Sequence, residues 1–117
     1  MKILMRILVM LLSTAAIAGT AEKGKKLFTE RSCMSCHAVG SEGSAKTGPN
    51  LAGVTQRRSK AWLSKWLQNP DTMRTDPVIQ KMDSKYHSTM PNLGLSATDV
   101  DDLLTYLSAA PGKTGSK

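Results

Sequence analysis

Residues 33 to 37 read Cys33-Met34-Ser35-Cys36-His37, a C-x-x-C-H motif. This arrangement, two thiols two residues apart with a histidine directly after the second, is the attachment sequence of c-type haem. The spacing allows both thiols to form thioethers with the vinyl groups of one porphyrin, and it holds the histidine below the ring. The sequence therefore predicts one covalent haem, attached through Cys33 and Cys36, with His37 as an axial ligand of the iron.

Other uses of the two cysteines fit the sequence less well. A thioredoxin-like redox pair requires a βαβ context, and no strand pattern surrounds the motif. A zinc site requires two more ligands, and His87 is the only further histidine. A disulfide is the usual state of a cysteine pair in an exported protein, but the histidine that follows Cys36 favours haem attachment.

A second axial ligand would close the iron, and methionine opposite histidine is the pair that raises the reduction potential in electron carriers. Residues 22–110 offer several candidates, namely Met34, Met73, Met82, Met90 and His87. Met82 lies on an apolar helical face and is expected to pack in the core. Met90 is favoured, because Pro91 restricts its backbone and stiffens the loop that carries it. His87 stays its main rival.

The two ends of the chain are expected to lie outside the folded domain. Residues 1–21 have the three parts of a secretory signal: a basic start, an apolar run of about a dozen residues and a close of small residues. Cleavage is expected after Ala18 or Ala21, and the alternative is an uncleaved N-terminal anchor. The domain then spans residues 22–110 and is exported to the periplasm, and residues 111–117 form a flexible tail.

Helical periodicity and caps predict an all-α domain. The expected helices cover residues 22–31, 60–69 with Ser59 as cap, 77–86 with Asp76 as cap, and a last stretch that starts at Ser96. The buried face of the last helix is expected to hold Val100, Leu103, Leu104 and Leu107. Gly24 inside the first helix is explained if another helix approaches closely there. With only one Phe, two Trp and two Tyr, the chain is expected to fold around a large apolar cofactor.

Two more residues are candidates for contact with the cofactor. Pro49, in the run Gly48-Pro49-Asn50-Leu51, can stack beside His37 and orient its imidazole through the nearby carbonyls. The indole N–H of Trp62 can reach a haem propionate. Core packing is the competing interpretation for Trp62, and an ordinary turn for Pro49.

The formal charge is +7, and it falls to about +5 when Lys2 and Arg6 leave with the signal. The basic residues are scattered and form no tract with interleaved aromatic residues, so the pattern does not favour nucleic-acid binding. A distributed positive surface is suited to docking on acidic protein partners, and solubility alone is the competing interpretation of the charge.

Taken in order, these features resemble the small class I cytochromes c. The likeness covers about residues 22–110 and is carried by Gly24 and Phe28, Cys33 to His37, Gly48 to Leu51, Trp62 to Pro70, Met90-Pro91 and Tyr106-Leu107. The resemblance implies about four to five short helices wrapped around one haem, with His37 and Met90 as axial ligands and an exposed haem edge.

The function that follows is transfer of single electrons between periplasmic or membrane redox partners such as an oxidase, a reductase or a dehydrogenase. We expect a monomer without a permanent membrane span, and not an enzyme. The competing hypothesis is a haem enzyme or gas sensor, which requires an open iron position and distal acid–base groups, of which only His87 is available. A third hypothesis is a haem-binding subunit that works only inside a larger complex.

Overall fold

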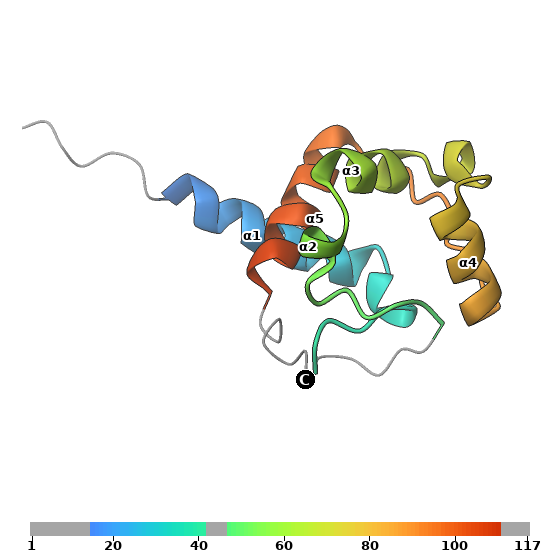
Figure 1. The fold of residues 1–117 in the computed structure, drawn as a ribbon. Coiled ribbons are helices and arrows are strands. Elements are labelled where there is room, and N and C mark those ends of the chain that lie inside the picture. The colour runs from blue at the N-terminus through green and yellow to red at the C-terminus, as the bar shows by residue number, and fades with distance from the viewer. Residues whose placement is uncertain (1–14, 42–46, 111–117) are drawn as a thin grey trace, which may run out of the picture.

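The computed structural model describes residues 15–41 and 47–110. Within these ranges the chain is helical and has no strand, which confirms the predicted all-α class (Figure 1). The elements in chain order are α1 (Ala15–Glu30), the 3-10 turn η1 (Cys33–Ser35), α2 (Val54–Arg57), α3 (Lys60–Gln68), the 3-10 turn η2 (Pro70–Met73), α4 (Pro77–Tyr86) and α5 (Ala97–Ala109).

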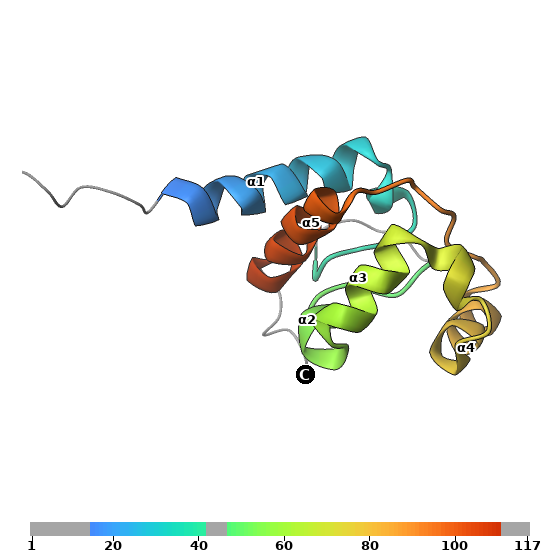
Figure 2. The ribbon, with the colours of Figure 1, turned by 90° about the horizontal axis from the view of Figure 1, so that it is seen from above.

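The first and last helices form the main packing unit. α1 lies across α5 in both ribbon views (Figures 1 and 2). At their crossing, a Cβ on Gly24 would collide with the backbone oxygen of Asp102 and lie 2.7 Å from Cβ of Tyr106. The predicted close approach of a second helix at Gly24 is therefore confirmed. Phe28 adds a tilted ring contact with Tyr106, at 5.7 Å between centroids.

The core is built on α5. The four positions predicted for its buried face, Val100, Leu103, Leu104 and Leu107, are all buried. Phe28 from α1 and Leu63 from α3 join the same cluster, and the half-buried Trp62 and Leu67 pack against it. These apolar contacts place α1, α3 and α5 in one body, next to which the motif and its loops are arranged.

Local caps explain where three helices begin. The Ser59 hydroxyl accepts from the Trp62 N–H at 3.1 Å before α3. The Asp76 carboxylate accepts from the Val78 N–H at 2.8 Å before α4. Ser96 and Asp99 form a reciprocal capping box before α5. All three helix starts agree with the sequence pattern, because each is determined by a capping side chain and N–H groups only two or three residues away.

α4 is set apart from the main helical body. It lies on the far side of the molecule from α1, beyond η2, in both ribbon views (Figures 1 and 2). Ile79 is its only buried residue. Between α4 and α5 the chain runs through residues 88–96 without regular secondary structure. We call this stretch the Met90 segment.

The N-terminal helix differs from the prediction. α1 begins at Ala15 instead of Glu22, so the expected cleavage positions Ala18 and Ala21 both lie inside it. Residues 1–14 of the expected signal and the expected tail, 111–117, lie outside the described residues. In the part of the chain that is described, no helix is both long and apolar enough to cross a membrane.

Candidate functional site

The C-x-x-C-H motif forms a tight turn directly after α1. Ser32 adopts a left-handed conformation (φ 60°), which ends the helical path and starts η1. The backbone N–H groups of Cys36 and His37 both donate to the Cys33 carbonyl, at 3.2 and 2.9 Å. This turn brings both thiols and the imidazole onto one short stretch of backbone. The cysteines are half-buried and are not joined in a disulfide.

Burial changes the protonation of two groups in the motif. It raises the pKa of the Cys33 thiol, which therefore stays protonated at neutral pH. It also lowers the pKa of His37, against the opposing effect of a hydrogen bond to the Pro49 backbone. The imidazole is therefore neutral at pH 7, which is the form that ligates a metal.

His37 is held in one orientation by the following loop. Its Nδ1 donates to the Pro49 carbonyl at 2.7 Å, which leaves Nε2 as the nitrogen with a lone pair. Gly48 permits this contact, because a Cβ at that position would lie 2.7 Å from Cε1 of His37 and 2.9 Å from Nδ1. The loop therefore fixes both the ring orientation and the tautomer of His37.

Polar side chains brace that loop in turn. Asn50 pairs with the backbone of Gly40 in both directions, each at 2.9 Å. Arg57 donates to the carbonyls of Ala52, at 2.6 Å, and Asn50, at 3.0 Å. The contacts of Asn50 and Arg57 thus set the position of the Pro49 carbonyl. These supporting residues were not predicted from the sequence.

The candidates for the second axial position lie in different surroundings. Met73 is buried, with 4% of its surface exposed, and belongs to the core. Met34 is 45% exposed, and His87 is exposed at the end of α4. Met82 is half-buried on α4. Met90 is half-buried on the irregular Met90 segment, where no helix restricts the direction of its side chain.

The indole N–H of Trp62 already has a hydrogen-bond partner within the protein. Its indole N–H donates to Asp76 Oδ2 at 3.2 Å, and its ring stacks on Trp66 with 6.4 Å between centroids. Arg58 lies over the outer face of the Trp62 ring, at 5.6 Å. A haem propionate would therefore have to compete with Asp76 for this N–H, and the contact between Trp62 and the cofactor stays a prediction.

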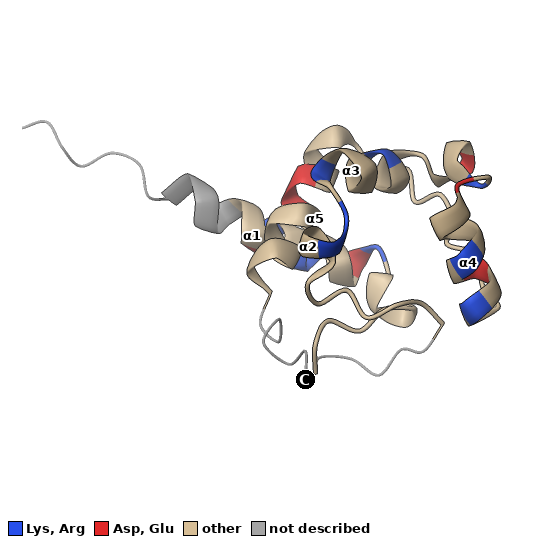
Figure 3. Ribbon diagram, in the orientation of Figure 1, with Lys and Arg blue, Asp and Glu red and all other residues tan. Residues whose placement is uncertain are grey.

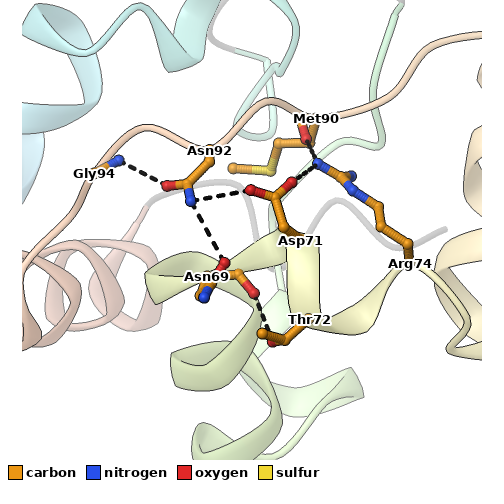
Figure 4. Close-up of polar contacts among 7 residues, drawn as sticks. All are labelled: Asn69, Asp71, Thr72, Arg74, Met90, Asn92 and Gly94. Carbon is orange, nitrogen blue, oxygen red and sulfur yellow. Dashed lines mark hydrogen bonds and ion pairs between the residues drawn. The ribbon is translucent and has the colours of Figure 1, made fainter.

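The Met90 segment is held by residues that were not predicted from the sequence. Arg74 Nη2 donates to the Met90 carbonyl at 2.9 Å and to Asp71 Oδ1 at 3.0 Å (Figure 4). The Asn92 amide donates to Asp71 Oδ2 at 3.2 Å, and its oxygen accepts from the Gly94 N–H at 2.9 Å. The Asp71–Arg74 spacing of three residues was the one local signal for this network.

These groups can be tested for their fit to a haem. Two thiols, a neutral imidazole with Nε2 available and the thioether of Met90 on a separate segment are the donor types that the attachment and ligation of a c-type haem require. Arg74 Nη1 is a buried donor without a hydrogen-bond partner among the described residues. A group that carries carboxylates, as haem does, would supply an acceptor for it. The residues present therefore fit the cofactor.

Comparisons with known proteins show which family and fold the chain shares. A family model described as cytochrome c matches residues 21–111. The fold is similar to that of a cytochrome c from Rhodothermus marinus, with a TM-score of 0.71, 28% sequence identity and coverage of 86% of this chain and 84% of that one. It is also similar to a cytochrome c domain of the pp3183 protein from Pseudomonas putida, with a TM-score of 0.62, 38% identity and coverage of 73% and 84%.

Curated relatives include both small proteins and larger subunits. A cytochrome c oxidase subunit 2 from Bacillus subtilis is 32% identical over 98 residues, which is 74% of this chain and 26% of that protein. A cytochrome c-553-like protein from Synechocystis is 29% identical over 92 residues, 79% of this chain and 70% of that protein. The chain thus spans about a quarter of the length of the first of these relatives and most of the second.

Proposed function

The chain belongs to the cytochrome c family, as a small class I member, and from this premise we propose that it is a monohaem carrier of single electrons. The observation that carries the proposal is the C-x-x-C-H turn with its histidine fixed by the Pro49 carbonyl at 2.7 Å. That geometry supports a permanent, non-exchanging ligand, which suits a carrier that keeps its cofactor outside the cytoplasm.

Each residue at the site then has one task. Cys33 and Cys36 would hold the haem covalently, and His37 would ligate the iron through Nε2 while the Pro49 carbonyl fixes its ring. Met90 would supply the second protein ligand. When bound, the haem supplies an iron that gains or loses one electron. Two protein ligands on stiff supports keep the geometry the same in both states, so no catalytic residue is needed and the protein is not an enzyme.

The surface charge supports a proposal for the partner. The sequence carries a net charge of +7, and lysine and arginine lie on α1, α2, α3 and α4, whereas the charged residues of α5 are all acidic (Figure 3). A positive surface attracts acidic proteins and orients them over distances of about 10 Å at moderate ionic strength. We propose an acidic redox protein in the periplasm, such as an oxidase, a reductase or a dehydrogenase, as donor or acceptor.

The ligand assignment is tested by absorption spectra of the purified protein, oxidised and reduced, with carbon monoxide added to the reduced form. We expect low-spin bands, a weak far-red sulfur-to-iron band and no reaction with carbon monoxide. Met90→Ala should remove the far-red band and admit carbon monoxide, because the sulfur ligand is lost. His87→Ala is the matched control and should leave both features unchanged.

Each other outcome has a definite meaning. If Met90→Ala keeps the far-red band, Met90 is not the ligand. If the unmodified protein binds carbon monoxide readily, the iron is open and the haem enzyme or gas sensor replaces the carrier. A protein without any haem spectrum, after expression together with haem-attachment machinery, would contradict the whole proposal.

A further inference from the structure

We propose that the Met90 segment is clamped at two points by two arginines, Arg74 at Met90 and Arg31 at Leu93, and that this clamp keeps Met90 on the iron. The inference rests on the proposed function, since it takes Met90 as the second ligand. It concerns a stretch, residues 88–96, that has no regular secondary structure to fix its course. Something else must therefore position the methionine.

Arg74 holds the segment at the methionine itself. Its Nη2 donates to the Met90 carbonyl at 2.9 Å and to Asp71 at 3.0 Å, so the carboxylate fixes the guanidinium that fixes the loop (Figure 4). The same guanidinium lies over the Trp66 ring at 5.6 Å. The hydrogen bonds to Asp71 and to the Met90 carbonyl and the contact with the Trp66 ring thus immobilise the Arg74 side chain. Through Arg74, the rigidity of η2 and α3 is transferred to Met90.

Asn92 ties the segment to the same turn two residues later. Its amide donates to Asp71 Oδ2 at 3.2 Å and, at 3.4 Å, to Asn69 Oδ1. Its side-chain oxygen accepts from the Gly94 N–H at 2.9 Å, which shapes the bend where Gly94 has a φ of 64°. Asp71 therefore accepts hydrogen bonds from Arg74, which holds Met90, and from Asn92. The two residues that are held, Met90 and Asn92, lie on either side of Pro91.

Arg31 holds the segment three residues further along the chain than Met90. It lies two residues before Cys33, and its Nη1 donates to the Leu93 carbonyl at 3.1 Å. Its Nη2 lies 4.0 Å from Asp99, the capping residue of α5. This contact links the end of α1, where the haem is attached, to the segment that carries the other axial ligand. A thioether is a neutral and weak ligand, so its hold on the iron depends on such positioning.

The test measures how easily imidazole replaces Met90 on the ferric iron of the intact haem protein. Arg74→Gln should bind imidazole about tenfold more tightly than the unmodified protein, the equivalent of one charge-assisted hydrogen bond. Asn92→Ala, which leaves Arg74 in place, should bind it about fivefold more tightly. Arg74→Lys keeps one charged donor and should fall between Arg74→Gln and the unmodified protein. In each case the far-red band should weaken in parallel.

Lys60→Gln serves as the control, because it removes a charge and an exposed ion pair with Asp101 at 3.3 Å, away from the Met90 segment. It should bind imidazole as the unmodified protein does. If Arg74→Gln and Asn92→Ala also behave in this way while Met90→Ala opens the iron, the clamp is wrong and the proposed function stands. If the unmodified protein has no far-red band, the ligand assignment itself fails. Should Arg74→Gln not fold, Asn92→Ala decides.

Discussion

Gly24 and Gly48 show how much a missing side chain can determine. Neither glycine is needed for an unusual backbone angle. Gly24 makes room for the α5 backbone at Asp102, and Gly48 makes room for the ring of His37. In both cases the neighbour is backbone or a ring held by a hydrogen bond, so it cannot move away from an added methyl group. The packing of α1 on α5 therefore depends on the absence of a side chain at Gly24, and the orientation of His37 depends on its absence at Gly48.

Gly24→Ala should lower the free energy of unfolding by about 3 kcal/mol, because the new methyl group forces α1 away from α5. Alanine is the better helix former, so propensity alone would predict a gain of about 1 kcal/mol. Denaturant unfolding of the haem-loaded protein distinguishes the two. Gly53→Ala is a useful comparison: its φ of 74° carries a cost, but only a flexible Arg57 nitrogen lies near, at 3.4 Å. A Gly24→Ala protein as stable as the unmodified one would contradict the close helix contact.

The helices differ in how far their bounds could be predicted. The starts of α3, α4 and α5 were predicted from Ser59, Asp76 and Ser96, because a cap acts on N–H groups two or three residues away. α2 and the two 3-10 turns were missed, since three or four residues carry no periodicity. The first helix was predicted to begin at Glu22 and begins at Ala15.

The same division applies to the candidate site. The motif and its histidine could be identified from five adjacent residues, and the Gly48-Pro49 turn from its glycine and proline. The contacts of Arg74 with Met90 and of Arg31 with Leu93 join positions 16 and 62 residues apart. No local pattern encodes such pairs, because they depend on how the whole chain is folded.

The cap of α4 should make stability depend on pH in the acid range. The hydrogen bond from the Val78 N–H, followed by the one from Trp62, holds the pKa of Asp76 below its usual value. A lowered carboxyl pKa adds stability above the unfolded pKa of about 4, and that stability is lost as the pH falls through the folded value.

Asp76→Asn retains a capping oxygen but cannot titrate. The unmodified protein should therefore be the more stable of the two at about pH 6. Its advantage should shrink as the pH approaches about 3, as read from urea unfolding midpoints along the series. A stability difference that stays constant over the whole range would show that the Asp76 charge has no such role.

At the scale of the whole molecule, the apolar core is concentrated on one side. The buried cluster joins α1, α3 and α5, whereas α4 contributes only Ile79 to the buried residues and makes at most slight contact with the other helices. A domain of this size buries a modest fraction of its surface. α4 is therefore expected to owe its order to the cofactor.

A chain with both Cys33→Ala and Cys36→Ala, which cannot attach haem, tests this expectation by amide hydrogen exchange. α4 should lose its protection, whereas α1 and α5 should keep the larger part of theirs. The haem-loaded protein is the reference. Equal protection of α4 with and without haem would mean that the helix is stable on its own contacts.

The pairing of α1 with α5 has a consequence for the order of events during maturation. The two helices come from opposite ends of the described chain, so their contact forms only after the last helix has been made and brought back over a long loop. Until then α1, and with it the turn at Cys33 that follows, lacks its main packing partner. Pairing with α5 therefore gives the cysteine turn its fixed position at a late step of folding.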